Sequence, residues 1–225
     1  MTEKIAEYFT IPDKEDIEVP KLLFIVSGPS GVGKATLIRN VIKKLPNINK
    51  VITYTTRRPR PNEKDGEDYH FIGEKDFMKF VESNDIFEYE KVYGDFYYGS
   101  PSDVFSHAPE ENDVILELDP LGMQTYKENY DNIVTMFIAP PHFEEIISRI
   151  NKRAPEKNIM NRLKNAMFML NQANNFDYVV VNDDLDASVQ QMIEIINVER
   201  LRRDKELEVS KLKVELDRIK NKYKD

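Results

Sequence analysis

The stretch "LLFIVSGPSGVGKATL", residues 22–37, decides the fold of this chain. An apolar run of strand length leads directly into a glycine-containing loop, and the helical pattern "KATLIRNVIKKL" at 34–45 overlaps its end. The loop nearly matches G-x-x-x-x-G-K-[ST], the pattern in which backbone N–H groups and a helix N-terminus surround a phosphate group. The stretch therefore predicts a strand, a phosphate loop and a helix that together bind a nucleotide.

Within this loop the glycines allow the turn, and Lys34 is placed to reach the β- and γ-phosphates of a nucleotide. Ala35 departs from the pattern, since the Ser or Thr expected there would touch the magnesium ion. Magnesium retains several waters and is often held mainly by phosphates, so we expect Mg²⁺ to accompany the bound nucleotide without a protein ligand. The predicted phosphate contacts come from Gly28, Pro29, Ser30, Gly31, Val32, Gly33, Lys34, Ala35 and Thr36.

Composition narrows the class of protein. The chain has 225 residues, of which 40% are hydrophobic and 32% charged, and this is enough for one sizeable domain. Its net charge of -8 argues against a general nucleic-acid or membrane-surface binder, although small anions remain possible ligands. The absence of cysteine excludes disulfides and thiolate metal sites. Residues 1–20 lack the apolar segment of a secretory signal, so we expect a cytoplasmic protein.

Apolar runs and helical patterns alternate along the rest of the chain. Further runs at 113–119, 132–140 and 176–183 are typical of strands covered on both faces, and helical patterns occupy 142–150 and 159–173. Strands that alternate with helices predict an α/β fold with a parallel sheet.

The chain is predicted to divide into an extension, a domain and a tail. The segment from Tyr54 to Ser100 is aromatic, basic and punctuated by Gly and Pro, which indicates an inserted unit with short strands. A second, Arg-rich helical segment follows the run at 132–140. The expected parts are an extension at 1–20, a domain at 21–198 (core 21–53, 101–141 and 167–198, insert 54–100, lid 142–166) and a tail at 199–225.

The tail is a highly charged helical pattern with apolar residues at alternating spacings of three and four. These residues are Val209, Leu212, Leu216, Ile219 and Tyr223. Such a stripe fits a helix that packs on its own domain or projects into solvent, and it also fits a coiled coil with a second copy. The sequence leaves monomer and homodimer open.

Further motifs narrow the function. They are "TTRRPRPNEKDGEDYHF" (55–71), "FEYEKVYGDFYYGS" (87–100), "ILELD" (115–119), "FIAPP" (137–141) and "VNDDLD" (181–186). With the phosphate loop, and in this order, they make residues 21–198 resemble the guanylate kinase family of P-loop nucleoside monophosphate kinases. The resemblance implies a three-layer parallel α/β sheet with an inserted GMP-binding subdomain and a helical lid. It also implies transfer of the γ-phosphoryl group of ATP to GMP.

The resemblance further implies which residues hold GMP. Two arginines and a tyrosine fix its phosphate, which suits guanidinium forks, and two carboxylates read the base. Guanine offers a ring N–H and an amine that carboxylates accept, whereas adenine lacks the ring donor. The implied GMP contacts are Thr53, Arg57, Arg60, Tyr69, Glu88, Tyr98, Ser100 and Asp119.

By the same resemblance, Arg149, Arg153 and Arg162 are lid arginines that join Lys34 in stabilising the moving phosphoryl group. Asn182 matches a residue at the adenine of ATP.

Two other functions are open. A non-catalytic guanylate-kinase-like binding module is favoured by Ala35 and opposed by an otherwise nearly whole phosphate loop. The chain could also be a kinase for another nucleoside monophosphate, but Glu88 and Asp119 would then have no guanine to recognise.

Overall fold

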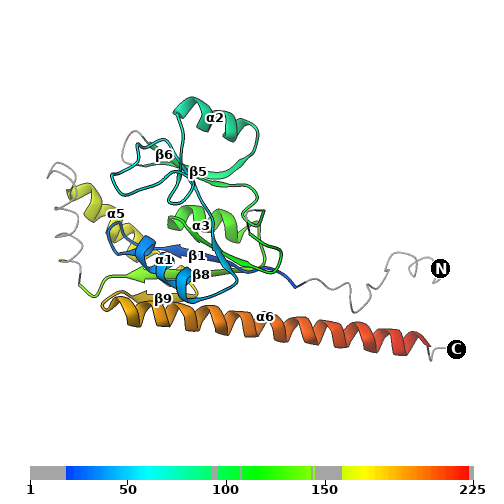
Figure 1. Cartoon of the computed structure of the whole chain (residues 1–225). Helices are drawn as coiled ribbons and strands as arrows, with labels where there is room; N and C mark the ends of the chain where they lie inside the picture. Colours follow the sequence, from blue (N-terminus) through cyan, green and yellow to red (C-terminus); the bar gives the residue numbers. More distant parts are fainter. Residues whose placement is uncertain (1–18, 93–95, 107, 143, 145–158, 223–225) are drawn as a thin grey trace. The chain divides into compact units, whose positions relative to one another are not determined.

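The structure, a computed structural model, describes residues 19–92, 96–106, 108–142, 144 and 159–222 (Figure 1). Within the described chain there are two compact units, one of residues 21–194 and one that includes residues 195–222.

The larger unit is built on a five-stranded parallel sheet in the order β2-β7-β1-β8-β9. In that order the strands are β2 (Ile48–Lys50), β7 (Asp113–Glu117), β1 (Leu23–Ser27), β8 (Ile133–Ala139) and β9 (Tyr178–Val181). The central strand β1 is buried at every residue. A run of apolar residues without alternation is what a strand covered on both faces requires.

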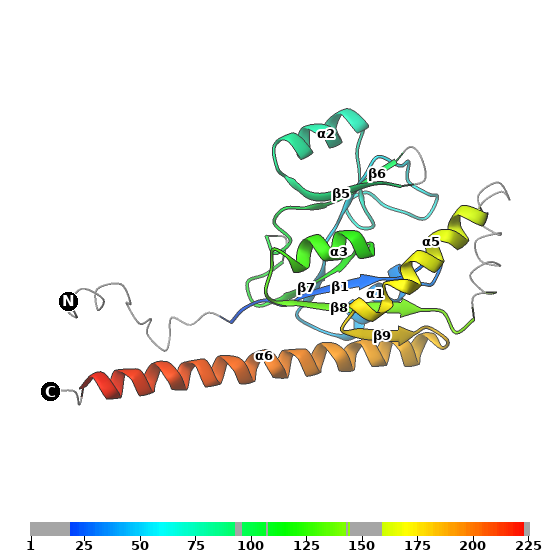
Figure 2. The ribbon, with the colours of Figure 1, turned by 180° about the vertical axis from the view of Figure 1, so that it is seen from behind.

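Between these strands in the sequence lie α1 (Lys34–Lys44), α3 (Pro120–Lys127), α5 (Ile159–Asn171) and the 3₁₀ turn η4 (Ala173–Asn175), and α6 (Leu185–Lys222) follows the last strand. The crossover through α1 leads from β1 to β2, and that through α3 leads the other way, from β7 to β8. Right-handed crossovers in opposite directions place their helices on opposite faces of a sheet. Figures 1 and 2 show α5 on the same side of the sheet as α3, so the fold has three layers.

A buried cluster between the sheet and α3 fixes the edge where the phosphate loop begins. Leu23 and Ile25 of β1 pack there with Leu116 of β7 and Tyr126 of α3, all essentially without solvent exposure. Burying a side chain of this size stabilises a fold by about 1.5–3 kcal/mol. The cluster holds β1 and β7 in register, with Val26 opposite Glu117.

A second sheet lies between β2 and β7 in the sequence, in the order β4-β3-β6-β5. Its strands are β4 (His70–Phe71), β3 (Tyr54–Thr55), β6 (Phe96–Pro101) and β5 (Ile86–Val92), and α2 (Glu74–Glu82) accompanies them. Phe77 of α2 is fully buried and stacks on Tyr97 with ring centroids 5.5 Å apart. Because side chains alternate along a strand, Tyr98 and Ser100 alternate with Tyr97 and Gly99 along β6.

The predicted α/β fold with a parallel sheet is confirmed. All four predicted core strands lie within two residues of the observed ones at each end, and the final run at 176–183 shortens most, to β9. The run at 113–119 was expected to end in Asp119, and this was wrong. The strand ends at Glu117, and Asp119 is the N-cap residue of α3, because Pro120 is suited to the first helical turn.

The predicted helix at 142–150 falls almost entirely outside the described residues. Helix α6 continues without a break through the boundary expected at residue 198. The division into core, insert, lid and tail stays a prediction. Among the described helices, none is both long and apolar enough to cross a membrane.

Candidate active site

The phosphate loop has the backbone that its glycines were expected to permit. Gly28, Gly31 and Gly33 have φ angles of 142°, 86° and 103°, a region that favours glycine. A side chain at Gly28 would also collide with the carbonyl oxygen of Ile138 on β8. The loop therefore packs closely on the sheet and ends at Gly33, the N-cap of α1, where the helix dipole favours an anion.

Lys34 turns back across this loop. Its Nζ donates to the carbonyl oxygen of Gly28 at 2.6 Å and lies 3.5 Å from the Oε1 atom of Glu117. Only 11% of the Lys34 side chain is exposed. The loop thus carries a held positive charge, balanced by a carboxylate at the end of the neighbouring strand.

Glu117 also borders the other half of the site. Burial is the largest cause of the raised pKa of Tyr69, and the negative charge of Glu117 adds to it. Burial likewise raises the pKa of Asp119, where Lys34 opposes the shift and Glu117 again adds to it. One carboxylate is therefore electrostatically coupled to both the phosphate loop and the aromatic residue expected at GMP.

Asn182, which directly follows β9, is hydrogen-bonded to the phosphate loop. Its Nδ2 donates to the carbonyl oxygen of Val32 at 2.7 Å, and its backbone N–H donates to Ala139 at 2.8 Å. A side chain at Gly33 would lie 2.6 Å from the same Nδ2. This contact of Asn182 with the loop was not predicted from the sequence. Its contact with adenine stays a prediction.

Arg57 and Arg60 converge on one carboxylate, that of Glu63. Arg57 donates to it twice, at 2.7 and 3.0 Å, and its Nε donates to the Tyr98 hydroxyl at 3.1 Å. The backbone N–H of Arg60 donates to it at 2.8 Å, and the Arg60 guanidinium lies 3.4 Å away. Burial works to raise the pKa of Glu63, but these hydrogen bonds outweigh it and lower the pKa. Glu63 therefore stays ionised and positions both arginines.

Tyr69 packs beside this cluster and is secured by Lys50 of β2. The Arg57 guanidinium lies 5.5 Å from the centre of the Tyr69 ring, and the Tyr69 and Tyr98 rings are 5.9 Å apart. The Nζ of Lys50 donates to the carbonyl oxygens of Glu67 and Asp68 at 3.0 and 2.8 Å. These bonds tie the loop that carries Tyr69 to the central sheet.

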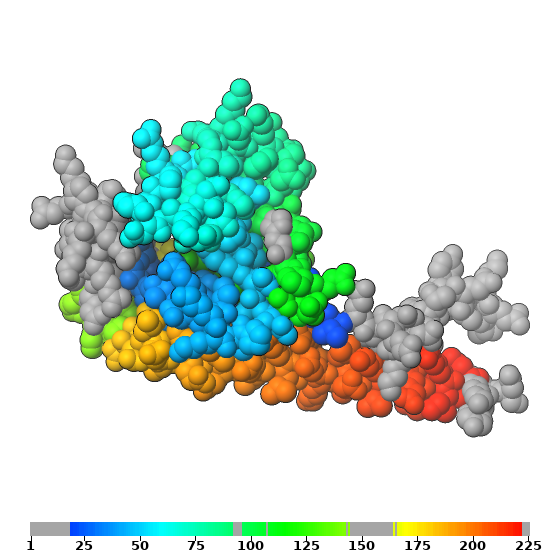
Figure 3. Space-filling view, in the orientation of Figure 1, coloured from blue at the N-terminus to red at the C-terminus, as the bar shows by residue number. Residues whose placement is uncertain are grey.

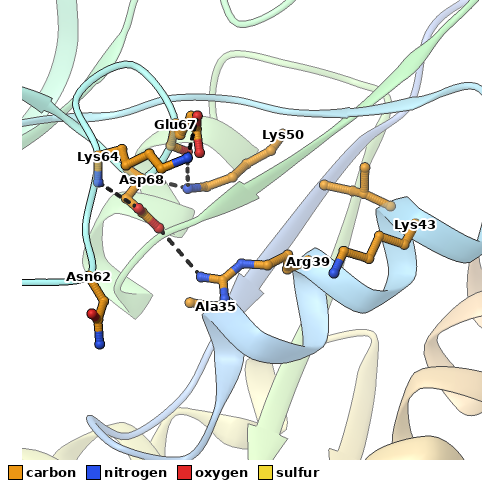
Figure 4. Close-up of a pocket in the computed structure, with 9 residues that line it drawn as sticks. Ala35, Arg39, Lys43, Lys50, Asn62, Lys64, Glu67 and Asp68 are labelled. Carbon is orange, nitrogen blue, oxygen red and sulfur yellow. Dashed lines mark hydrogen bonds and ion pairs between the residues drawn. The ribbon is translucent and has the colours of Figure 1, made fainter.

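A pocket of about 390 Å³ lies between α1 and this loop. Figure 3 shows a hollow between the surfaces of these segments, and Figure 4 shows the residues that line it. Arg39 extends from α1 toward Asp68, 3.5 Å away, and Ala35 lies at the start of the same helix. The pocket is lined by Ala35, Arg39, Ile42, Lys43, Lys50, Asn62, Lys64, Glu67 and Asp68. Cations outnumber acids there, which suits a region next to bound phosphates.

Glu88 and Asp119, the predicted base-reading carboxylates, lie close enough to influence each other. Burial raises the pKa of Glu88 to about 7, a hydrogen bond from Ser100 opposes this shift, and the charge of Asp119 adds to it. The Ser100 hydroxyl lies 3.3 Å from the Glu88 carboxylate and accepts from Tyr126 at 2.9 Å. A side chain at Gly122 of α3 would come within 2.7 Å of the Glu88 carboxyl carbon. The space for this carboxylate therefore depends on the absence of a side chain at Gly122.

The remaining predicted residues are placed as follows. Thr53 is partly buried, and its carbonyl oxygen accepts from His70 at 2.8 Å. Thr36 is exposed on α1. Arg149 and Arg153 lie outside the described residues, and of Arg162 only the backbone is described, in α5.

The guanylate kinase family model matches residues 21–199 of the chain. The chain belongs to the guanylate kinase family. Proteins named guanylate kinase from Thermotoga maritima and from Caldanaerobacter subterraneus subsp. tengcongensis are both 41% identical to it, over 79% and 82% of this chain and 87% and 90% of those proteins. A crystal structure of guanylate kinase from Anaplasma phagocytophilum matches with a TM-score of 0.68 at 27% identity, over 81% of this chain and 88% of that one. The resemblance read from the motifs is confirmed.

Sequence reasoning missed several residues of this guanylate kinase site. Glu63 follows Arg60 by three positions in the same motif, so its spacing was a usable signal. Glu117 ends a strand beside the phosphate loop, and strand ends are where ligands of open α/β sheets bind. No pattern in the sequence pointed to Lys50 or Gly122, because their roles arise from segments distant in the chain.

Asn182→Ala is expected to weaken binding of inorganic tripolyphosphate as well as ATP, each by about fivefold, because a lost hydrogen bond of about 1 kcal/mol loosens the loop at Val32. Titration calorimetry measures both affinities. The control is Asn129→Ala, which removes a similar side-chain bond, to the carbonyl oxygen of Thr125 at 2.8 Å, just after the end of α3. A loss confined to ATP would assign Asn182 to adenine alone and contradict the positioning role.

Glu88→Gln is expected to gain stability relative to the natural chain as the pH rises. A pKa raised to about 7 means that the folded chain holds this proton more tightly than the unfolded chain does, so ionisation near pH 7 disfavours folding. The free energy of unfolding of the variant, minus that of the natural chain, should increase by about 2 kcal/mol between pH 5 and pH 8. Urea unfolding at several pH values measures it. A difference that stays flat over this range would show that Glu88 ionises freely.

Proposed function

We propose that this protein transfers the γ-phosphoryl group of Mg²⁺-bound ATP to GMP, giving ADP and GDP. An oxygen of the GMP phosphate attacks the γ-phosphorus in line, and the bond from that phosphorus to the β–γ bridging oxygen breaks. The observation that carries the proposal is the presence, in one unit, of the lysine-bearing phosphate loop, the Arg57 and Arg60 cluster at Glu63, and the Glu88–Asp119 pair. Membership of the guanylate kinase family supports it.

On the donor side, the loop N–H groups, the N-terminus of α1 and Lys34 are proposed to hold the phosphates of ATP. Lys34 is poised for this, because the carbonyl oxygen that it now contacts is a weaker partner than a phosphate. Arg149, Arg153 and Arg162 are proposed to close over the transferring group and exclude water.

On the acceptor side, Arg57, Arg60 and Tyr69 are proposed to fix the GMP phosphate, with Tyr98 and Thr53 near it. Most donors of Arg57 are already engaged with Glu63, Tyr98 and the Arg58 carbonyl, so the guanidinium is held in place before GMP arrives. Glu88, Asp119 and Ser100 are proposed to read guanine. Because Glu88 must accept from guanine as a carboxylate, its pKa of about 7 makes GMP binding favourable above neutral pH.

The residues around the phosphate loop offer few oxygen ligands to Mg²⁺. Glu117 offers an oxygen of the kind that Mg²⁺ prefers, next to Lys34, whereas Ala35 offers none. Within the described part of the chain, no three acidic or histidine side chains gather as a protein-only metal site would require. We therefore propose that Glu117 contacts the ion or its waters, and that phosphates supply the other ligands. The ion would spread the charge that develops on the phosphates.

The proposal is tested by measuring ADP formation in the presence of GMP, AMP, CMP or UMP. We expect GMP to be favoured over AMP by a large factor, because adenine would leave a buried carboxylate unsatisfied. Glu88→Gln should raise the KM for GMP at least tenfold with little change in the KM for ATP.

Equal rates with AMP would remove the role given to the two carboxylates. No ADP formation with any acceptor, together with no ATP binding at millimolar concentration, would favour the non-catalytic module instead.

Ala35→Ser restores the hydroxyl that the loop pattern expects next to Lys34. One added magnesium contact, worth about 1 kcal/mol, should lower the half-saturating Mg²⁺ concentration about fivefold. Steady-state rates measured against free Mg²⁺ at saturating ATP and GMP test this. Ser30→Ala provides a comparison at the other end of the loop. An unchanged Mg²⁺ dependence in Ala35→Ser would mean that the metal is bound away from α1.

A further inference from the structure

The last part of α6 presents an apolar stripe to solvent. Val209, Leu212, Leu216 and Ile219 are spaced by three, four and three residues, and they are 41%, 58%, 51% and 48% exposed. With Val209 and Leu216 at position a of a heptad and Leu212 and Ile219 at position d, they form the seam of a coiled coil. Covering such an exposed apolar seam with a matching seam removes apolar surface from water and stabilises the helix.

The charges beside the seam indicate what covers it. Glu208 and Glu215 occupy the g positions, while Lys213 and Lys220 occupy the e positions. In a parallel pair of helices, each g residue faces the e residue five positions further along the other helix. Glu208 would thus face Lys213 of a second copy, and Glu215 would face Lys220, and the symmetry of the pair repeats both contacts.

An antiparallel pair would bring like charges together. There g faces g and e faces e, so Glu208 would meet Glu215 and Lys213 would meet Lys220. Within one helix, Glu208 pairs with Lys211 at 3.3 Å and Lys220 pairs with Asp217 at 3.4 Å, and both pairs are exposed. Exposed pairs of this kind contribute little, so exchanging them for contacts between helices costs little.

We propose that residues 208–220 of α6 form a parallel, in-register, two-stranded coiled coil with a second copy of this chain. Val209 with Leu212 is the combination that favours two strands, although Leu216 with Ile219 relaxes that preference. Arg202 and Lys205 take the a and d positions before Val209, so the seam covers about two heptads. The association is accordingly weak and depends on concentration. It is independent of the proposed reaction, because none of these residues belongs to the site.

Because the chain of 225 residues contains no cysteine, a single introduced cysteine can report the register of the two helices. In a parallel, in-register pair, identical d residues lie side by side at a distance suited to a disulfide. Leu212→Cys is expected to form disulfide-linked dimers under mild oxidation, at least tenfold more than the control Ser210→Cys. Ser210 is exposed on the same helix and lies at position b, away from the seam.

Charge exchange provides the second measurement. Sedimentation of the natural chain should show a monomer–dimer equilibrium, and Lys213→Glu with Lys220→Glu should shift it at least tenfold toward monomer. Adding Glu208→Lys and Glu215→Lys should restore the dimer with the charges reversed. Equal crosslinking of Leu212→Cys and Ser210→Cys, a monomer at all concentrations, an assembly larger than two chains, or no rescue by the fourfold exchange would each overturn the proposal.

Discussion

The site depends on one electrostatic arrangement, the pairing of Lys34 with Glu117 at the carboxyl ends of two adjacent strands. The register of β1 with β7 places the phosphate loop beside Glu117, and the buried cluster around Tyr126 fixes that register. The lysine is thereby held at the loop, 2.6 Å from the Gly28 carbonyl oxygen, rather than extended into water. Its positive charge is in place before any phosphate arrives, so binding requires little reorganisation.

The same principle is repeated across the candidate site. Arg57 and Arg60 are positioned by Glu63, and Arg39 lies at Asp68, so the cations next to the proposed phosphate positions have carboxylate partners from the chain itself. Such pairs lower the cost of holding several positive charges in one region. They also keep long side chains in a few conformations, which reduces the entropy lost when a ligand binds.

Much of the fold was predictable because its signals are local. The glycines of the phosphate loop encode its backbone, and the apolar runs encode buried parallel strands. The continuity of α6 could also have been predicted, since residues 185–222 contain neither Gly nor Pro. The charged tail instead led to a predicted boundary at residue 198. By contrast, the contact of Asn182 with Val32 joins residues 150 positions apart, and Lys50 meets carbonyl groups of a loop that only the folded chain brings near. The family resemblance supplied the site residues, and their ligand contacts stay predictions.

The most direct test of this account is a crystal structure with GMP and a non-hydrolysable ATP analogue bound. The account predicts that the GMP phosphate lies within hydrogen-bond distance of Arg57 and Tyr69, that the base reaches Glu88 and Asp119, and that Lys34 leaves the Gly28 carbonyl for a phosphate oxygen. A GMP molecule bound elsewhere, with Arg57 still engaged only by Glu63 and its present neighbours, would contradict it.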